Sequence, residues 1–234
     1  MLVNKQDSKV KRMVGDYRKL NQRSFSHAGF LPNMESLVEQ LAQNRFKTKV
    51  DMRSGFWQIE LSKRAQDLTA FVTPSGRVFK WLVMPFRLKN APAVFQELME
   101  QVLAQMRRKP RVKELNGRGA NFGAFFDDGG FGTNSIEDHI QLLEEFFLAC
   151  QENDLRIKLP KCTFCKEELT YLGFDIGHGF WRPSQKKLAA LMNAEISSLK
   201  DLKKFLGACN FYRRHVKGFS FTYARLFDKL KTKL

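Results

Sequence analysis

Residues 123–131 read Gly-Ala-Phe-Phe-Asp-Asp-Gly-Gly-Phe, and this stretch decides how the rest of the chain is interpreted. The small and aromatic residues before the acidic pair favour a β-strand, while Asp-Asp-Gly-Gly has the composition of a tight turn. The stretch therefore predicts a β-hairpin with the carboxylates of Asp127 and Asp128 at its tip. An isolated pair of this kind is a solvated turn in most proteins, so a chemical role needs a further carboxylate elsewhere in the chain.

That carboxylate is found upstream, where residues 45–50 alternate in polarity and predict a strand that ends at Asp51. If this strand lies beside the hairpin, three carboxylates converge, and without a counter-ion their pKa values would rise strongly. Mg²⁺ prefers a few carboxylates together with phosphate oxygens and water. Pairs of such ions about 3.5–4 Å apart serve polymerases and nucleases. The sequence thus predicts a Mg²⁺ site, with Mn²⁺ as an alternative ion, at Asp51, Asp127 and Asp128.

The composition is that of a folded intracellular protein. With 234 residues, 43% of them hydrophobic, the chain suits one large domain or two or three lobes around a shared core. Its four cysteines form no even framework, which fits a reducing compartment. The sequence has no signal peptide and no apolar run near 18 residues. We therefore expect a location in a cytoplasmic particle or the nucleus, without secretion and without a membrane partner.

Positive charge gathers at both ends of the chain. The formal net charge is +16, of which residues 1–23 contribute +5 and residues 186–234 contribute +9, whereas residues 24–185 carry only +2. Basic ends around a nearly neutral body suit a polyanion held from two sides. The alternative interpretation is ordinary charge that keeps the protein in solution.

The remaining apolar patterns mix helices and strands without regular alternation. Because βαβ units are absent, the order predicts an α+β domain followed by a helical appendage. Asn33 and Ser135 are expected to cap helices, and residues 107–121 are expected to form a loop. The predicted helices lie near 33–41, 91–106, 135–150 and from 184 onward. The predicted further strands lie near 57–61, 68–72, 78–83, 155–159 and 169–176.

Several motifs in this order resemble the reverse transcriptases of gypsy-type long-terminal-repeat retrotransposons and, more distantly, those of retroviruses. The resemblance covers essentially the whole chain. It implies a right-hand polymerase fold with an antiparallel palm sheet packed on helices. Partial fingers and the start of the palm would occupy 1–50, and the palm would occupy 51–182 with a fingers insertion near 57–90. A basic helical thumb would occupy 183–234, and no RNase H domain is expected. The motifs are Lys11–Asn21, Phe46–Leu61, Val83–Gln96, Phe125–Asp128, Tyr171–Phe174 and Leu202–Arg214.

The resemblance also implies an activity, RNA-directed DNA synthesis, in which a primer 3′-hydroxyl attacks the α-phosphate of a deoxynucleoside triphosphate. The implied partners are an RNA or DNA template with its primer, the triphosphate, and downstream RNase H and integrase domains of the same polyprotein. Asp51, Asp127 and Asp128 would be catalytic. The implied nucleotide contacts are Arg12, Lys5, Phe56, Phe86 and Arg87. The implied primer and template contacts are Gln96, Phe125, Phe126, Tyr171, Leu172, Gly173, Lys203, Lys204, Arg213 and Arg214.

Two of these residues have a second interpretation. Phe56 could exclude the 2′-hydroxyl of ribonucleotides, or it could be ordinary core packing. Gln96 could contact the template or a neighbouring motif, or it could simply be a polar residue on a core-facing helix. The spacing of Cys162 and Cys165 is that of metal ligands, but no second pair follows, so we do not expect a zinc site.

Departures from the family pattern suggest an alternative function. Arg87 stands where the family has glycine, and Gly129 and Gly130 replace apolar residues after the acidic pair. Since glycine weakens a strand interior, the hairpin is expected to be loose. Gly15 likewise replaces a branched apolar residue. The alternative is therefore a catalytically decayed copy that acts at most as a nucleic-acid-binding or ribonucleoprotein scaffold module.

Overall fold

The computed structural model describes residues 2–4, 11–27, 29 and 31–224. Its centre is a four-stranded antiparallel sheet made of β3 (Phe46–Asp51), β6 (Asn121–Phe125), β7 (Asp128–Thr133) and β8 (Thr163–Lys166). The strand order is β6-β7-β3-β8. β6 and β7 are the arms of the predicted hairpin, and β3 is the predicted strand that ends at Asp51. The α+β prediction is confirmed.

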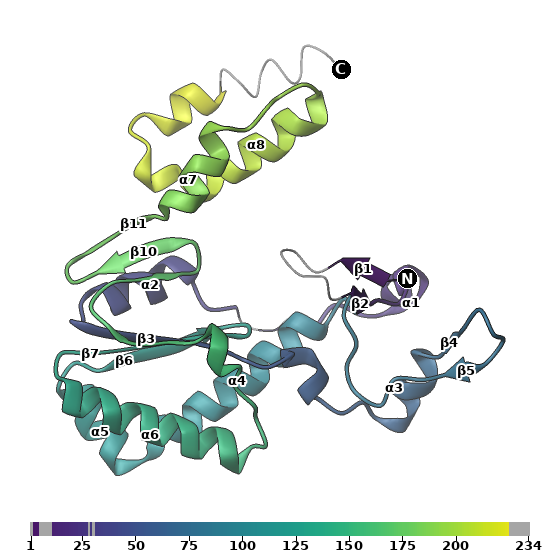
Figure 1. The fold of residues 1–234 in the computed structure, drawn as a ribbon, viewed down its shortest axis with the longest axis horizontal. Coiled ribbons are helices and arrows are strands. Elements are labelled where there is room, and N and C mark those ends of the chain that lie inside the picture. The colour runs from purple at the N-terminus through teal and green to yellow at the C-terminus, as the bar shows by residue number, and fades with distance from the viewer. Residues whose placement is uncertain (1, 5–10, 28, 30, 225–234) are drawn as a thin grey trace.

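Helices cover both faces of this sheet (Figure 1). One face packs against α2 (Met34–Ala42), and the other packs against α4 (Ala91–Arg108) and α6 (Ile136–Glu152), with α5 (Pro110–Gly117) beside them. The predicted caps are present: the side chain of Asn33 accepts hydrogen bonds at the start of α2, and that of Ser135 accepts one from Asp138 N. The sheet is therefore buried between two apolar clusters.

Glycines allow α2 to lie close to the sheet. Gly130 on β7 faces α2, and a Cβ atom there would lie 2.6 Å from Leu41 Cδ1 and 3.0 Å from the ring of Tyr171. At Gly129, which faces the other way, a Cβ would meet the Phe131 ring at 3.3 Å. Both glycines are paired on each side, with β3 and with β6. The expectation of a loose hairpin is therefore wrong, because the missing side chains leave room for close packing.

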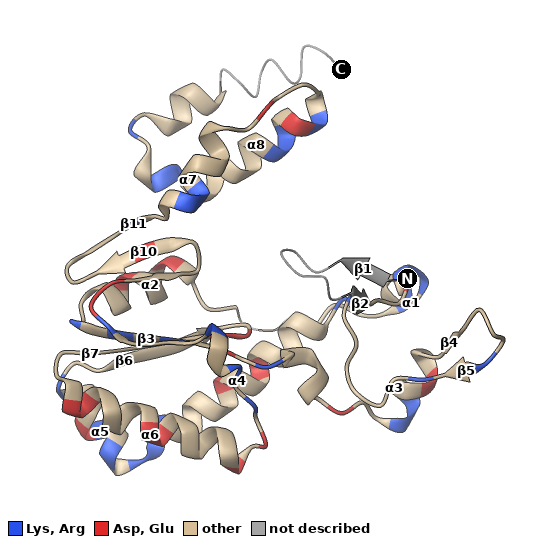
Figure 2. Ribbon diagram, viewed as in Figure 1, with Lys and Arg blue, Asp and Glu red and all other residues tan. Residues whose placement is uncertain are grey.

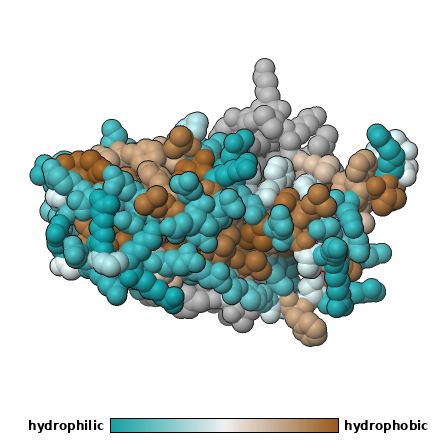
Figure 3. Space-filling model, turned by 90° about the horizontal axis from the view of Figure 1, so that it is seen from below, coloured by the Kyte–Doolittle hydropathy of each residue, from teal (hydrophilic) through white to brown (hydrophobic). Residues whose placement is uncertain are grey.

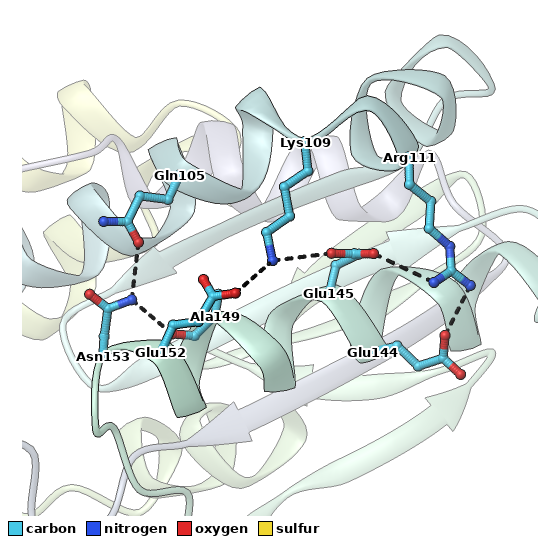
Figure 4. A network of polar contacts seen from close by, with 8 residues as sticks. All are labelled: Gln105, Lys109, Arg111, Glu144, Glu145, Ala149, Glu152 and Asn153. Carbon is cyan, nitrogen blue, oxygen red and sulfur yellow. Dashed lines mark hydrogen bonds and ion pairs between the residues drawn. The ribbon is translucent and has the colours of Figure 1, made fainter.

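Ionic contacts join α6 to the corner between α4 and α5 (Figure 4). Lys109 Nζ lies 3.3 Å from Glu145 and 3.4 Å from Glu152, while Arg111 lies 2.9 Å from Glu144 and 3.5 Å from Glu145. The Glu145 side chain is only 10% exposed. A carboxylate at such a site is costly without its cations, so the network fixes how the two parts of the helical layer meet.

Lys47 is a buried cation near the start of β3. Its side chain is fully buried, and Nζ donates to Asn44 O at 2.6 Å, Glu167 O at 2.9 Å and Arg45 O at 3.3 Å. Burial lowers the pKa of this ammonium group. All three of its donors find carbonyl acceptors, so Lys47 fastens the start of β3 to the loop that follows β8.

A second antiparallel sheet and a helical unit follow in the chain. The sheet has the order β11-β10-β9 and contacts α2, and the helical unit lies beyond it (Figure 1). The predicted strand over 169–176 is two strands, because Leu172 and Gly173 form a turn between them. The elements are β9 (Leu169–Tyr171), β10 (Phe174–Gly177), β11 (Phe180–Pro183), α7 (Gln185–Met192), α8 (Leu199–Phe211) and the 3₁₀ turn η3 (Arg213–His215).

The N-terminal elements and residues 55–83 extend to one side of the main sheet (Figure 1). Seen from below, hydrophobic side chains reach the surface among hydrophilic ones over this extension and over the main body (Figure 3). Val72, Val78 and Leu82 are among the exposed apolar residues. The elements are β1 (Leu2–Asn4), β2 (Lys11–Met13), α1 (Arg18–Arg23), the 3₁₀ turn η1 (Gly55–Gln58), α3 (Lys63–Leu68), β4 (Phe71–Val72) and β5 (Val78–Phe79).

Three local predictions are wrong, and a fourth is confirmed only in part. The loop predicted over 107–121 contains α5, which begins at a proline, a residue suited to the first helical position. The strand predicted over 57–61 is instead the end of η1 followed by an isolated bridge from Glu60 to Val83; Ser54, with a φ of 53°, turns the chain before it. The hairpin predicted over 68–83 is present, but its paired strands are limited to β4 and β5. The strand predicted over 155–159 is one bridge followed by the 3₁₀ turn η2 (Leu159–Lys161).

No helix among the described residues combines the length and the apolar character needed to cross a lipid bilayer.

Candidate active site

The three acidic residues lie at one end of the central sheet. Asp51 ends β3, Asp128 begins β7, and the two are direct partners across the antiparallel pair. Such partners point to the same face with Cβ atoms about 4.5–5.5 Å apart. Asp127 is in the turn, and its carbonyl accepts a hydrogen bond from Met52 N at 2.9 Å. The backbone register therefore brings the predicted catalytic residues to one edge.

Electrostatics at this edge favour a cation. Burial raises the pKa of the Asp128 carboxyl, and the negative charges of Asp127 and Asp51 raise it further. The positive charges of Lys49 and Lys161 oppose this rise. Lys161 Nζ lies 3.3 Å from Asp51 Oδ2. Within the described ranges, no three His, Cys, Asp or Glu side chains are close enough to hold a metal ion as they stand. The oxygen donors and their mutual repulsion nevertheless fit a hard divalent cation, which would remove that repulsion.

Gln96 holds the hairpin tip from the side of α4. Its side chain is fully buried; Oε1 accepts a hydrogen bond from Phe126 N at 2.6 Å, and Nε2 donates to Ala124 O at 3.0 Å. Phe126 has a φ of 53°, a left-handed conformation that is strained for a residue other than glycine. Of the interpretations of Gln96, contact with a neighbouring motif matches these bonds, and no face of the side chain is open to a template.

Tyr171 holds the same hairpin from the side of β9. Its hydroxyl donates to Asp128 O at 2.9 Å, and its side chain is almost completely buried. Burial raises the pKa of this phenol well above its ordinary value. Its predicted contact with a primer is therefore not available to the ring. Tyr171 instead fixes the backbone of an acidic residue, a role that no local sequence signal indicated.

A cavity of about 730 Å³ lies between this edge and the C-terminal helices. Asp128 and Lys49 line it from the central sheet, the turn residues Leu172 and Gly173 from the second sheet, and Lys187 from α7. Leu172 and Gly173 have φ values of 50° and 88°, so the backbone at their turn is left-handed. The structure thus brings two of the predicted primer contacts to the cavity that contains Asp128.

Phe56 lies in an aromatic cluster in the turn that follows β3. In η1, its ring centroid is 5.5 Å from that of Phe86 and 6.0 Å from that of Phe95. The side chain is half-buried. Packing accounts for one side of the ring, so discrimination against ribonucleotides by the other side stays a prediction.

Arg87 keeps the backbone conformation that suits glycine. Its φ is 74°, and Asn21 holds the turn by donating from Nδ2 to Arg87 O at 2.9 Å and accepting from Lys89 N at 2.8 Å. A cavity of about 340 Å³ lies beside it, and Gly15 is among the lining residues. A Cβ at Gly15 would lie 2.5 Å from the Tyr17 ring, which fills the place of a branched side chain.

The other predicted contacts are only partly described. Lys5 lies outside the described residues, and of Arg12 only the backbone, in β2, is described. Lys203 and Lys204 are exposed on α8, a helix that carries several basic residues (Figure 2). Further along, Arg213 is exposed, and Arg214 pairs with Glu35 of α2 at 2.7 Å. The rings of Phe125 and Phe126 pack edge to face at the hairpin tip, with their centroids 4.7 Å apart.

Comparison with known proteins agrees with this geometry. The chain matches the model of the family described as reverse transcriptase (RNA-dependent DNA polymerase) over residues 3–176. It is 30% identical over 210 residues to the retrovirus-related Pol polyprotein from transposon 297 of Drosophila melanogaster, and 31% identical over 225 residues to that from transposon 412. These matches cover 89% and 96% of this chain but 19% and 17% of those polyproteins. The chain thus spans about a fifth of the length of these relatives.

Solved structures give the same answer. The foamy viral protease-reverse transcriptase dRH in complex with double-stranded DNA superposes with a TM-score of 0.84 at 26% identity, over 99% of this chain and 38% of that one. The same protein in complex with an RNA/DNA hybrid gives a TM-score of 0.82 at 26% identity, over 99% of this chain and 29% of that one. Fold, sequence motifs and relatives agree, and the chain belongs to the reverse transcriptase (RNA-dependent DNA polymerase) family.

Proposed function

We propose that this chain is the polymerase part of a retrotransposon Pol polyprotein and that it synthesises DNA on an RNA or DNA template. The observation that carries this proposal is the register of the central sheet, in which Asp51 is paired with Asp128 while Asp127 forms the adjoining turn. Gln96 and Tyr171 hold this turn from opposite sides. Positioned groups of this kind matter because a misplacement of about 1 Å can cost roughly a hundredfold in rate.

The proposed lobes follow the architecture. We assign 1–50 to partial fingers and the start of the palm, and 51–182 to the palm with a fingers insertion near 57–90. Residues 183–234 are assigned to the thumb. Support comes from the central sheet in the first two segments, the lateral extension formed by residues 55–83, and the separate helices α7 and α8 (Figure 1).

Asp51, Asp127 and Asp128 would hold Mg²⁺, or Mn²⁺ in its place. When bound, such ions activate the attacking hydroxyl and stabilise the leaving pyrophosphate. The protein's own contribution is to hold the carboxylates on a rigid sheet edge and to present an adjoining cavity for the primer end. Deoxynucleotide contacts are proposed for Phe56 and, beside it, Phe86. Further contacts to the triphosphate are proposed for Lys5, Arg12 and Arg87.

The proposed partner is a primer–template duplex. The exposed cations Lys203, Lys204 and Arg213 support this proposal, since phosphate contacts supply most of the sequence-independent affinity for nucleic acids. The foamy viral relatives were solved with double-stranded DNA and with an RNA/DNA hybrid. Because the chain spans about a fifth of the related polyproteins, RNase H and integrase domains are proposed as further partners within the same polyprotein.

Primer extension on poly(rA)·oligo(dT) with Mg²⁺ or Mn²⁺ tests this function. We expect extension by the unchanged chain, its loss in Asp127→Asn, and its retention in Asp154→Asn, which makes the same change at an exposed turn. Duplex binding should weaken as salt rises. Extension that survives in Asp127→Asn would refute the assignment of the carboxylates. Salt-sensitive binding without extension would support the catalytically decayed copy.

A further inference from the structure

Lys161 approaches the acidic edge from outside the two strands that carry the carboxylates. It ends η2, just before β8, and its Nζ lies 3.3 Å from Asp51 Oδ2. The Lys161 side chain is 48% exposed, whereas that of Asp51 is 21% exposed. The contact therefore joins a half-exposed cation at the surface to a carboxylate that is mostly shielded from water.

The backbone fixes η2 against Asp51. Lys158 N donates to Asp51 O at 2.9 Å, and Lys161 N donates to Lys158 O at the same distance. Asp51 N in turn donates to Cys162 Sγ at 3.4 Å. Because the residues on both sides of Lys161 are bound to Asp51, the ammonium group is kept within reach of this carboxylate.

We propose that Lys161 is the internal counter-ion of the acidic edge when no metal is bound, and that a divalent cation has to displace it from Asp51. This inference rests on the proposed function, because it concerns the same metal-binding carboxylates. The edge gathers three carboxylates whose repulsion must be balanced, and Asp51 Oδ2 is one of the oxygens that a metal would need. An ammonium group in contact with that oxygen competes for it directly.

Lys49 offers a matched comparison. It lines the cavity beside Asp128 and, like Lys161, opposes the rise that burial causes in the pKa of that carboxyl. No ion pair joins Lys49 to Asp51 among the described residues. Removal of either lysine deletes one positive charge near the edge, but only removal of Lys161 frees Asp51 Oδ2.

The test is a titration of the full chain with Mn²⁺, without nucleic acid or nucleotide, in which free Mn²⁺ is followed by electron paramagnetic resonance. Lys161→Met should tighten binding by about fivefold, as expected when an ion pair of this exposure no longer competes. Lys49→Met should change it distinctly less, and Lys161→Arg should bind like the unchanged chain. Thermal unfolding of each variant confirms that it is folded.

The outcomes separate this inference from the proposed function. Equal tightening in Lys161→Met and Lys49→Met would show a general charge effect and overturn the inference. Unchanged or weaker binding in Lys161→Met would also overturn it, because the lysine would then not compete. Asp51→Asn should abolish binding in every background. If Asp51→Asn binds Mn²⁺ as tightly as the unchanged chain, the proposed metal site itself is refuted.

Discussion

Replacement of Gly130 by alanine should destabilise the protein, although alanine is the better residue in most strands. The added Cβ would lie 2.6 Å from Leu41 Cδ1 and 3.0 Å from the Tyr171 ring. Both neighbours are almost fully buried, and the Tyr171 hydroxyl is bound to Asp128 O, so neither can move freely. Gly129 provides the comparison, because the atoms nearest to its added Cβ would be the Phe131 ring at 3.3 Å and Val50 Cβ at 3.7 Å.

The size of the effect follows from these distances. Overpacking a buried site destabilises the folded state by about 1–3 kcal/mol. Alanine loses less backbone entropy on folding than glycine does, which offsets roughly 0.5–1 kcal/mol of this cost. We therefore expect Gly130→Ala to lower the free energy of unfolding by about 1–2 kcal/mol. Gly129→Ala should change it by less than about 1 kcal/mol, because its contacts are close to ordinary packing distances.

Urea unfolding followed by circular dichroism measures both variants. For a chain of this length, 1 kcal/mol shifts the melting temperature by about 2–4 °C, so a thermal scan gives a second reading. Gly130→Ala should also weaken primer extension, because displacement of Tyr171 loosens the backbone at Asp128. Gly130→Ala that is as stable as Gly129→Ala would refute the argument, and it would restore the view that apolar side chains are simply missing from this strand.

Three further changes test other parts of the site. Gln96→Leu should cost about 1–3 kcal/mol and reduce primer extension, because it leaves the buried Phe126 N and Ala124 O without partners; urea unfolding and the extension assay measure both effects. Arg87→Gly should raise the melting temperature by relieving a φ of 74°, worth about 1–2 kcal/mol, and no rise would mean that the turn is not strained. His139 has its pKa lowered by burial from 6.5 to about 4, so its contribution to stability is complete above pH 6.5 and is lost as the pH falls towards 4. The unchanged chain should lose up to about 1.4 kcal/mol per pH unit in that window, and an equal loss in His139→Leu would exclude the imidazole as the cause.

The sequence predicted the centre of the fold because its signals there are local. Alternation places β3, the composition of 123–131 places the hairpin, and Asn33 and Ser135 cap the helices where they were expected. These signals place Asp51 at the end of a strand and Asp128 at the tip of a hairpin. That the two elements are neighbours was a condition in the prediction, and the pairing of β3 with β7 meets it.

Tertiary contacts decide the features that were missed. The support given by Tyr171 to Asp128 joins residues on different sheets, and the pair of Lys161 and Asp51 joins residues far apart in the chain. Gln96 interrupts an apolar helical stripe, which marks it as unusual but does not say which backbone it meets. Gly130 was expected to loosen the strand, because the sequence of β7 alone does not show that α2 packs closely against this position.

The position of β3 in the sheet has a consequence for how the chain folds during synthesis. Both of its neighbours, β7 and β8, come much later in the sequence, so at about 5–20 residues per second the strand waits several seconds for a partner. An unpaired strand can join another chain, and lysines on strand edges hinder this. We infer that Lys47 and Lys49 hinder association of the unpaired β3 with other chains during synthesis. Lys47 then becomes buried once Glu167 has been synthesised and its carbonyl accepts the hydrogen bond. Ribosome-bound chains that end before β7 should then aggregate more readily when both lysines are replaced by threonine.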